Sequence, residues 1–178
     1  MSISGYILKW AGWKVIGNFP KEKKFVIVSV PHTSMWDFVI GRLFLYQYPI
    51  KPKFLIKKEL FFFPFGYLVK SMGGIPVDRS QKTDIVERLI TMFNHSDEMM
   101  LAITPEGTRK HVTEWKPGFY YIAKGARVPI LPSYFDYKNR IICMGDVFYA
   151  SENIEDDIKH IREFAKKAQP KHPEKYAY

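Results

Sequence analysis

The sequence predicts an α/β fold: a single domain with a mixed, mostly parallel β-sheet covered by helices on both faces. Short apolar runs rich in β-branched residues alternate along the chain with longer segments of helical periodicity, which is typical of strand-helix-strand units. The length of 178 residues suits one domain with its own core. A turn at Lys138-Asn139 joins two predicted strands closely, so we expect one antiparallel pair within the sheet.

The first segment, residues 1–18, predicts an amphipathic helix. Its apolar side chains recur at steps of three and four residues, and Trp10 and Trp13 lie near Lys9 and Lys14. Tryptophan beside lysine is typical of a helix that lies in a membrane interface. The same stripe also fits a terminal helix packed on its own domain, and the sequence leaves both interpretations open.

The later elements are predicted from apolar runs and their period. Residues 25–30 (FVIVSV) predict a buried strand because the run is short, apolar and β-branched. Further strands are expected at residues 53–56, 74–77, 99–104, 128–135 and 140–144. Helices are expected at residues 35–46, 84–94, 118–125 and 154–168, with a broken helix over 60–72. No repeat or low-complexity linker divides residues 1–178, so we expect one domain.

The composition narrows the class of partner. Hydrophobic residues make up 47% of the chain, which argues against a disordered protein. Lys and Arg number 27 against 18 Asp and Glu, giving a net charge of +9. Such a charge favours a nucleic acid, an anionic membrane, an acidic protein or a phosphorylated substrate. The aromatic content of 16% suits a lipid surface at least as well as RNA.

Two absences in the sequence indicate a cellular compartment. No apolar stretch approaches the roughly 20 residues that a membrane-spanning helix needs, and the N-terminus lacks a secretion-signal pattern. The single cysteine, Cys143, cannot form an internal disulfide, so the fold suits a reducing environment. We therefore expect a cytoplasmic protein.

Polar residues follow the ends of several predicted strands, where α/β sheets place their sites. The first such loop carries His32, and Asp37 lies in the first turn of the next predicted helix. An adjacent carboxylate fixes the tautomer of a histidine and stabilises its charged form, which suits a general base. The alternative is structural: Ser34 and Asp37 have the spacing of a helix capping box, and a histidine before a helix is commonly structural.

Two further loops carry glycine and arginine. Residues 73–79 (GGIPVDR) allow close approach of a ligand to the backbone, and Arg79 can form two hydrogen bonds to a phosphate. A tight turn with a surface Arg79–Asp78 pair explains the same residues. Residues 104–109 (TPEGTR) follow another apolar strand, and Glu106 and Arg109 there equally fit a solvated ion pair.

Together these motifs resemble the glycerolipid acyltransferase family, whose best-known members acylate lysophosphatidic acid. The resemblance rests on HxxxxD at 32–37, GxIxxxR at 73–79, PEGTR at 105–109 and VPILP at 128–132, in that order. Each motif is weak alone, but four in register are highly specific. The resemblance covers residues 25–137 and includes the segment KKEL at 57–60. It implies a glycerol-3-phosphate acyltransferase-like fold.

The resemblance also implies roles for individual residues. His32 is expected to act as the general base, with Asp37 orienting it. The residues expected to bind the phosphorylated acyl acceptor are Gly74, Arg79, Glu106, Gly107, Thr108, Arg109 and Lys116. No metal and no other cofactor is expected. Because a thioester is already activated, the reaction needs no covalent enzyme intermediate, and the chain contains no GxSxG nucleophile motif.

The expected function is acyl transfer from acyl-CoA or acyl carrier protein to a lysophospholipid, with 1-acylglycerol 3-phosphate as the expected acceptor. With this function we expect a peripheral position on the inner face of the cell membrane and no nucleic-acid partner. The net charge of +9 suits an anionic membrane, an anionic acceptor and an acidic carrier protein alike. One alternative is acylation of another lyso-lipid, such as an amino-acid-containing one. A second alternative is a basic lipid- or nucleic-acid-binding module without catalysis. This second alternative explains the charge but not the four ordered motifs.

Overall fold

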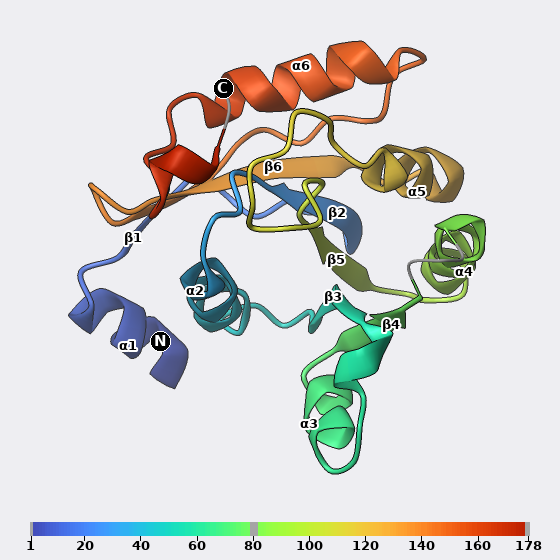
Figure 1. Cartoon of the computed structure of the whole chain (residues 1–178), viewed down its shortest axis with the longest axis horizontal. Helices are drawn as coiled ribbons and strands as arrows, with labels where there is room; N and C mark the ends of the chain where they lie inside the picture. The colour runs from blue at the N-terminus through green and yellow to red at the C-terminus, as the bar shows by residue number, and fades with distance from the viewer. Residues whose placement is uncertain (1, 79–81, 177–178) are drawn as a thin grey trace.

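A seven-stranded sheet forms the centre of the computed structural model, which describes residues 2–78 and 82–176 (Figure 1). Across the sheet the strand order is β1-β7-β6-β2-β5-β3-β4. The strands are β1 (Lys14–Ile16), β2 (Lys24–Ser29), β3 (Pro52–Lys57), β4 (Gly74–Val77), β5 (Met99–Ile103), β6 (Ile130–Asp136) and β7 (Ile141–Met144). Five neighbouring pairs are parallel, and β6 and β7 are antiparallel. The mixed, mostly parallel sheet predicted from the sequence is therefore confirmed.

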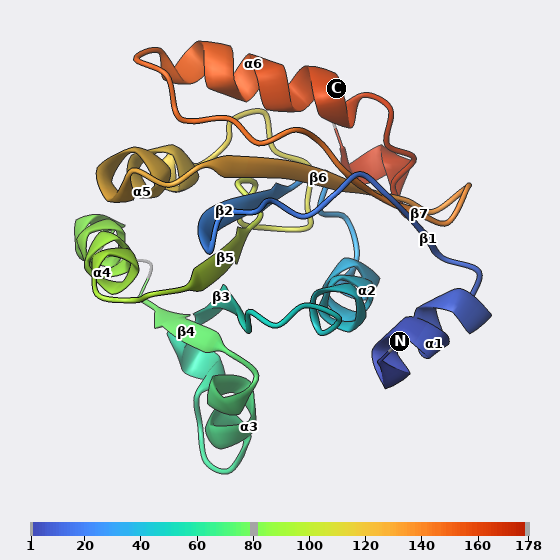
Figure 2. The same cartoon turned by 180° about the vertical axis from the view of Figure 1, so that it is seen from behind.

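Helices cover both faces of the sheet, as predicted (Figures 1 and 2). One face carries α1 (Ile3–Trp10), α2 (Met35–Leu45) and α3 (Phe65–Ser71), and the other carries α4 (Lys82–Asn94), α5 (Gly118–Ala126) and α6 (Ile154–Ala165). Short 3-10 turns lie at Lys58–Leu60 and Pro173–Lys175. Strand β2 shows why two layers are needed: its side chains alternate, so that Val26 and Val28 enter one core cluster and Phe25 and Ile27 enter the other.

The N-terminal segment corrects one prediction. Residues 1–18 do not form one helix, because α1 ends at Trp10 and Lys14–Ile16 form the edge strand β1 beside β7. Gly12, which follows the helix, has a φ of +79°, a backbone conformation that glycine adopts most readily and that an α-helix cannot continue through. The β-branched Val15 and Ile16 then favour the extended chain.

Helix α1 itself has two sides. Gly5 and Leu8 are buried, while Ile3 and Trp10 are 81% and 91% exposed. Helix α1 contacts α2. The helix therefore packs on its own domain and also presents apolar side chains to solvent. Within the described residues, no helix is long and apolar enough to cross a membrane.

The other predicted boundaries agree with the structure to within three residues, except in the 60–72 segment, where α3 begins only at Phe65. The largest difference at the start of a strand is in the 128–135 segment, where β6 begins at Ile130. Val128 instead belongs to the end of α5: its backbone N–H donates a hydrogen bond to the carbonyl of Ala123 at 3.0 Å. Pro129, which follows, has no N–H to contribute to a strand ladder.

Candidate active site

The loop after β2 turns directly into α2, and its residues cap that helix. The Ser34 hydroxyl accepts a hydrogen bond from the Trp36 backbone N–H at 3.1 Å, and the Asp37 carboxylate accepts one from the Ser34 N–H at 2.9 Å. This is the capping box that the structural interpretation predicted. It holds Asp37 in one position at the start of the helix.

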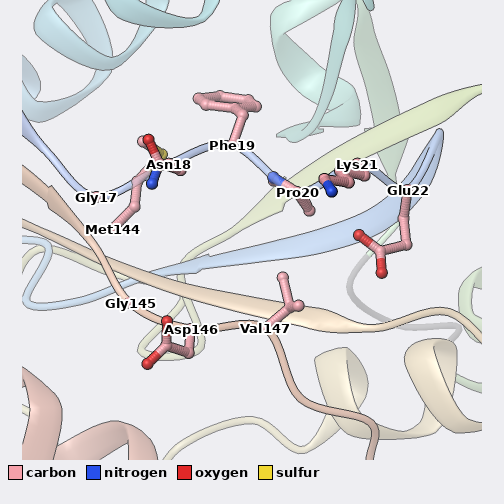
Figure 3. A pocket seen from close by; sticks show the side chains of 10 residues that line it. All are labelled: Gly17, Asn18, Phe19, Pro20, Lys21, Glu22, Met144, Gly145, Asp146 and Val147. Carbon is pink, nitrogen blue, oxygen red and sulfur yellow. The ribbon is translucent and has the colours of Figure 1, made fainter.

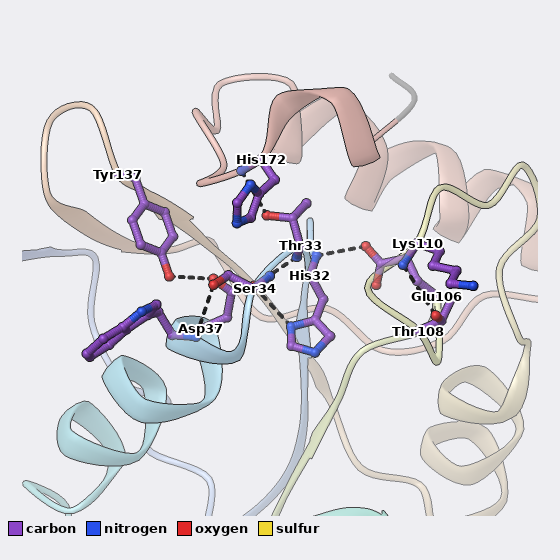
Figure 4. Close-up of polar contacts among 10 residues, drawn as sticks. His32, Thr33, Ser34, Asp37, Glu106, Thr108, Lys110, Tyr137 and His172 are labelled. Atoms are coloured by element: carbon purple, nitrogen blue, oxygen red, sulfur yellow. Dashed lines mark hydrogen bonds and ion pairs between the residues drawn. The ribbon is translucent and has the colours of Figure 1, made fainter.

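The same carboxylate also contacts His32. Asp37 Oδ2 lies 3.1 Å from His32 Nδ1 and accepts the Thr33 backbone N–H at 2.9 Å (Figure 4). The Asp37 side chain is only 4% exposed, whereas that of His32 is 19% exposed. Because a carboxylate accepts, the proton of a neutral His32 ring lies on Nδ1, which leaves a lone pair on Nε2. The capping and catalytic interpretations are therefore compatible, since one carboxylate makes both the capping contacts and the contact with His32.

The second oxygen of Asp37 has a partner that the sequence did not predict. Tyr137 directly follows β6, and its hydroxyl donates a hydrogen bond to Asp37 Oδ1 at 2.5 Å. Burial and the bond to Asp37 both raise the pKa of Tyr137, so the phenol remains protonated and acts as a donor. The only sequence signal for Tyr137 is its position at the end of a predicted strand.

Opposing effects set the charge state of Asp37. Burial raises its pKa, but hydrogen bonds from His32, Tyr137 and the Ser34 backbone lower it, and the net result lies below the ordinary value of 3.8. Asp37 is thus an anion at neutral pH. A buried anion beside Nδ1 orients the imidazole and stabilises the positive charge that forms when Nε2 takes up a proton.

Glu106 holds the other side of the His32 loop (Figure 4). It follows β5, which pairs with β2, and its Oε1 accepts the His32 backbone N–H at 3.0 Å. Glu106 is 5% exposed, and burial raises the pKa of its carboxyl group. Its second oxygen, Oε2, is buried and has no hydrogen-bond partner among the residues that the structure describes. That oxygen therefore retains unused hydrogen-bonding capacity.

The loop after β5 brings together several of the other predicted residues. Gly107 has a φ of +62°, and a Cβ at this position would lie 2.6 Å from Nζ of Lys116. The Lys116 N–H donates to the Pro105 carbonyl at 2.8 Å, which ties the two ends of the loop together. Thr108 accepts the Lys110 N–H, and Arg109 is exposed. Positive side chains therefore lie in the loop that carries Glu106.

Gly74, another predicted residue, does not join this cluster. Gly74 is buried at the amino end of β4, where a Cβ would lie 2.7 Å from Cγ1 of Val69 in α3. His32 and Glu106 follow the carboxyl ends of their parallel strands, whereas Gly74 lies at the amino end of β4. The close packing of α3 explains why this position is a glycine. Arg79 lies outside the described residues.

The C-terminal segment after α6 lies against the loop that carries His32, a contact that the sequence also did not predict. The His172 N–H donates to the Thr33 hydroxyl at 3.3 Å, and Nζ of Lys171 lies 5.0 Å from the ring centre of Trp36. The Tyr137 N–H donates to the Gln169 carbonyl at 2.8 Å. This segment therefore braces both the loop that carries His32 and the tyrosine that bonds Asp37.

A separate pocket lies at the other end of the sheet (Figure 3). Residues 17–22, which precede β2, and residues 144–147, which end and follow β7, line it. His32 follows the carboxyl end of β2, so this pocket is distinct from the His32 cluster.

The fold and the cluster define the class of protein: an α/β domain in which a buried aspartate holds a partly exposed histidine at the carboxyl end of the sheet. A family model described as Acyltransferase matches residues 13–136, which include His32, Asp37 and the loop after β5. The match covers more than half of the 178 residues. The chain belongs to the Acyltransferase family.

The chain also resembles a solved structure, the crystal structure of the 1-acyl-sn-glycerophosphate (LPA) acyltransferase PlsC from Thermotoga maritima. The TM-score is 0.64 at 19% sequence identity, covering 92% of this chain and 74% of that one. At this identity the likeness shows a shared fold, which agrees with the fold expected from the motifs. No curated protein matches the chain.

Proposed function

We propose that this acyltransferase moves a fatty acyl group from an acyl thioester to the free hydroxyl of a lysophospholipid, with 1-acylglycerol 3-phosphate as the expected acceptor. The contact between His32 Nδ1 and the buried Asp37 carboxylate carries the proposal. Membership of the family, the fold shared with an LPA acyltransferase and the net charge of +9 support it.

The chemical step follows from the orientation of His32. Its Nε2 takes the proton from the acceptor hydroxyl as the oxygen attacks the thioester carbonyl. A carbon–oxygen bond forms, the carbon–sulfur bond breaks, and the proton passes to the departing thiolate. Asp37 is a positioning residue, which holds the ring through Nδ1 and balances the imidazolium charge. A positioned general base contributes roughly 10²- to 10⁴-fold to the rate.

The residues after β5 fit the acceptor. Arg109 and Lys116 are exposed and positively charged, and both suit an acceptor phosphate. Glu106 suits the hydroxyl end of the acceptor better than the phosphate, because its charged form repels an anion. Its buried Oε2 can bond to a hydroxyl group in either protonation state. Gly107 and Thr108 complete the loop between these side chains.

The substrates also imply a membrane. A lysophospholipid resides in a bilayer, and the exposed Ile3 and Trp10 of α1 suit an amphipathic helix at a lipid interface. We therefore propose a peripheral position on an anionic membrane surface. The acyl donor would be acyl-CoA or acyl carrier protein, both of which are anionic.

Substrate profiling tests the proposed function. Purified protein is incubated with lysophosphatidic acid, other lyso-lipids and an amino-acid-containing lyso-lipid, each with acyl-CoA and with acyl carrier protein. Mass spectrometry then follows formation of the diacyl product. We expect transfer to lysophosphatidic acid to be fastest. A faster reaction with another lyso-lipid would reassign the acceptor, and no transfer to any of them would contradict the proposal.

A further inference from the structure

The segment between β3 and β4 presents apolar side chains outward, where a surface helix ordinarily carries polar ones. We name residues 60–68 the aromatic segment. Its exposed fractions reach 82% at Phe63 and 73% at Tyr67. Single exposed apolar residues are normal, but a contiguous set marks a contact surface. The exposed large apolar residues of the aromatic segment are Leu60, Phe62, Phe63, Phe65, Tyr67 and Leu68.

These exposed rings are not part of the core. Helix α3 is anchored by Gly66 and Val69, which are buried, with Val69 close to Gly74 of β4. The rings instead pair with one another: Phe62 stacks with Phe65 at 5.9 Å, and Phe63 meets Tyr67 edge-on at 6.2 Å. The inward side already attaches the helix, so the outward rings are available to a partner.

The charge around the aromatic segment selects an anionic partner. Residues 51–70 contain five lysines and one acidic residue, Glu59. Lys57, Lys58 and Lys70 flank the rings in the sequence and are exposed. Nζ of Lys58 lies 3.8 Å from the Asp78 carboxylate, in an exposed ion pair. Lysines beside exposed aromatic side chains match anionic headgroups above an apolar layer.

The position of the aromatic segment relates it to the active site. It begins just past the carboxyl end of β3. His32 and Glu106 follow the carboxyl ends of β2 and β5, so all three lie toward the same end of the sheet. Helices α1, α2 and α3 lie on one side of the sheet, and α3 projects beyond β4 (Figures 1 and 2). Trp10 of α1 and Trp36 of α2 are exposed on two of these helices. A bilayer on this side would therefore meet several apolar surfaces.

We infer that the aromatic segment inserts into the interface of an anionic lipid bilayer and forms a membrane contact separate from α1. The inference rests on the proposed function in that the acceptor is a membrane lipid. Protruding rings fit a deformable lipid layer, whereas a protein partner would need a matching hollow for each ring. A second copy of the chain is disfavoured because it would bring the same lysines together.

Vesicle flotation of the full chain tests the inference. One set of vesicles contains phosphatidylcholine alone, and the other contains equal parts of phosphatidylcholine and phosphatidylglycerol. The double variant Phe63→Ser/Tyr67→Ser should bind the anionic vesicles at least roughly tenfold more weakly than the wild type, because two interfacial rings are lost. The matched control is Tyr149→Ser, which removes a 61% exposed ring outside the aromatic segment and should leave binding unchanged.

The contradicting outcomes are distinct. The inference is wrong if the double variant binds anionic vesicles as the wild type does, or if the wild type binds neutral vesicles equally well. It is also wrong if light scattering shows that the wild type is a dimer, the double variant is a monomer and vesicle binding is retained. Loss of binding to acyl carrier protein with vesicle binding intact would assign the rings to a protein partner instead.

Activity separates this inference from the proposed function. The double variant should retain turnover on a short-chain acceptor dissolved in water and lose turnover on the acceptor in anionic vesicles. Absence of turnover in the wild type, with vesicle binding still dependent on the rings, would refute the proposed function alone.

A fluorescent label tests insertion directly, through a gain of signal rather than a loss of vesicle binding. Because Cys143 is the single cysteine, Phe63→Cys in a Cys143→Ser background accepts one environment-sensitive fluorophore. Anionic vesicles should shift its emission to the blue, and the same label at Tyr149→Cys should show no shift. Equal emission at both positions would contradict insertion of the aromatic segment.

Discussion

The Tyr137 hydroxyl donates a 2.5 Å hydrogen bond to the Asp37 carboxylate, although 100 positions separate the two residues in the chain. Asp37 Oδ1 accepts this bond and Oδ2 contacts His32, so both carboxylate oxygens have defined partners. Trp13 lies edge-on to the Tyr137 ring at 5.3 Å, so a residue before β1 also holds the tyrosine in place. The geometry of the base thus depends on distant parts of the chain.

Tyr137→Phe should lower the free energy of unfolding at pH 7 by about 1.5–3 kcal/mol, the range for a hydrogen bond to a charged group. The bond helps to hold the pKa of Asp37 below 3.8. A lowered carboxyl pKa contributes stability that is present above the unfolded-state value and lost as pH falls through the folded-state value. The difference in the free energy of unfolding between the variant and the wild type should therefore become smaller below pH 3.8. Chemical denaturation between pH 7 and pH 3 measures it.

Tyr149→Phe, at an exposed ring, is the control for that series and should change stability little at any pH. A stability difference for Tyr137→Phe that stays constant across the range would mean that the hydroxyl does not act through the ionised Asp37.

Asp37→Asn should reduce turnover nearly as much as loss of His32, because a neutral amide cannot stabilise an imidazolium ion in the same way. The two residues act as one unit, so the double variant should be little worse than either single variant. Steady-state kinetics of the three proteins measures this. If Asp37→Asn lowered stability by about 1 kcal/mol and left turnover intact, its role would be capping alone.

Arg109→Lys should raise the acceptor KM more than the donor KM, by roughly ten- to a hundred-fold, since lysine keeps the charge but loses the planar pair of donors. Arg79→Lys is predicted to behave in the same way. Arg88→Lys, at an exposed position of α4, is the control. Unchanged acceptor KM and turnover in both variants would mean that other residues bind the phosphate or that the acceptor has none.

Cys143→Ser should leave turnover largely intact, because the acceptor attacks the thioester directly. Cys143 lies in β7 and is buried next to Tyr134. Mass spectrometry of the protein after incubation with donor alone checks this expectation. An acyl group trapped on Cys143 would overturn the direct mechanism.

Most of the fold could be predicted because its elements are encoded locally. The apolar, β-branched run of β2 and the periodic stripe of α4 identify themselves within a few residues. The exception is β1: its three residues overlap a helical stripe, and their pairing with β7 comes from a contact more than a hundred positions away. Gly12 was the available sign that the helix would stop.

In the site, too, the local contacts could be predicted from the sequence and the long-range ones could not. His32 and Asp37 could be paired from the sequence because five positions and one helical turn bring them together. Glu106 was expected to bind substrate, but its bond to the His32 backbone depends on β2 and β5 being neighbours. Tyr137 and the C-terminal segment reach the loop through tertiary packing, which no local pattern encodes.

The most direct test of the account compares single-turnover acyl transfer by the wild type and by His32→Ala. Acyl thioester and lysophosphatidic acid are mixed with excess enzyme, and the diacyl product is quantified over time. The variant should remain folded by circular dichroism and lose at least roughly 10²- to 10⁴-fold in rate, the contribution of a positioned general base. A folded His32→Ala protein that transfers the acyl group at close to the wild-type rate would contradict the account.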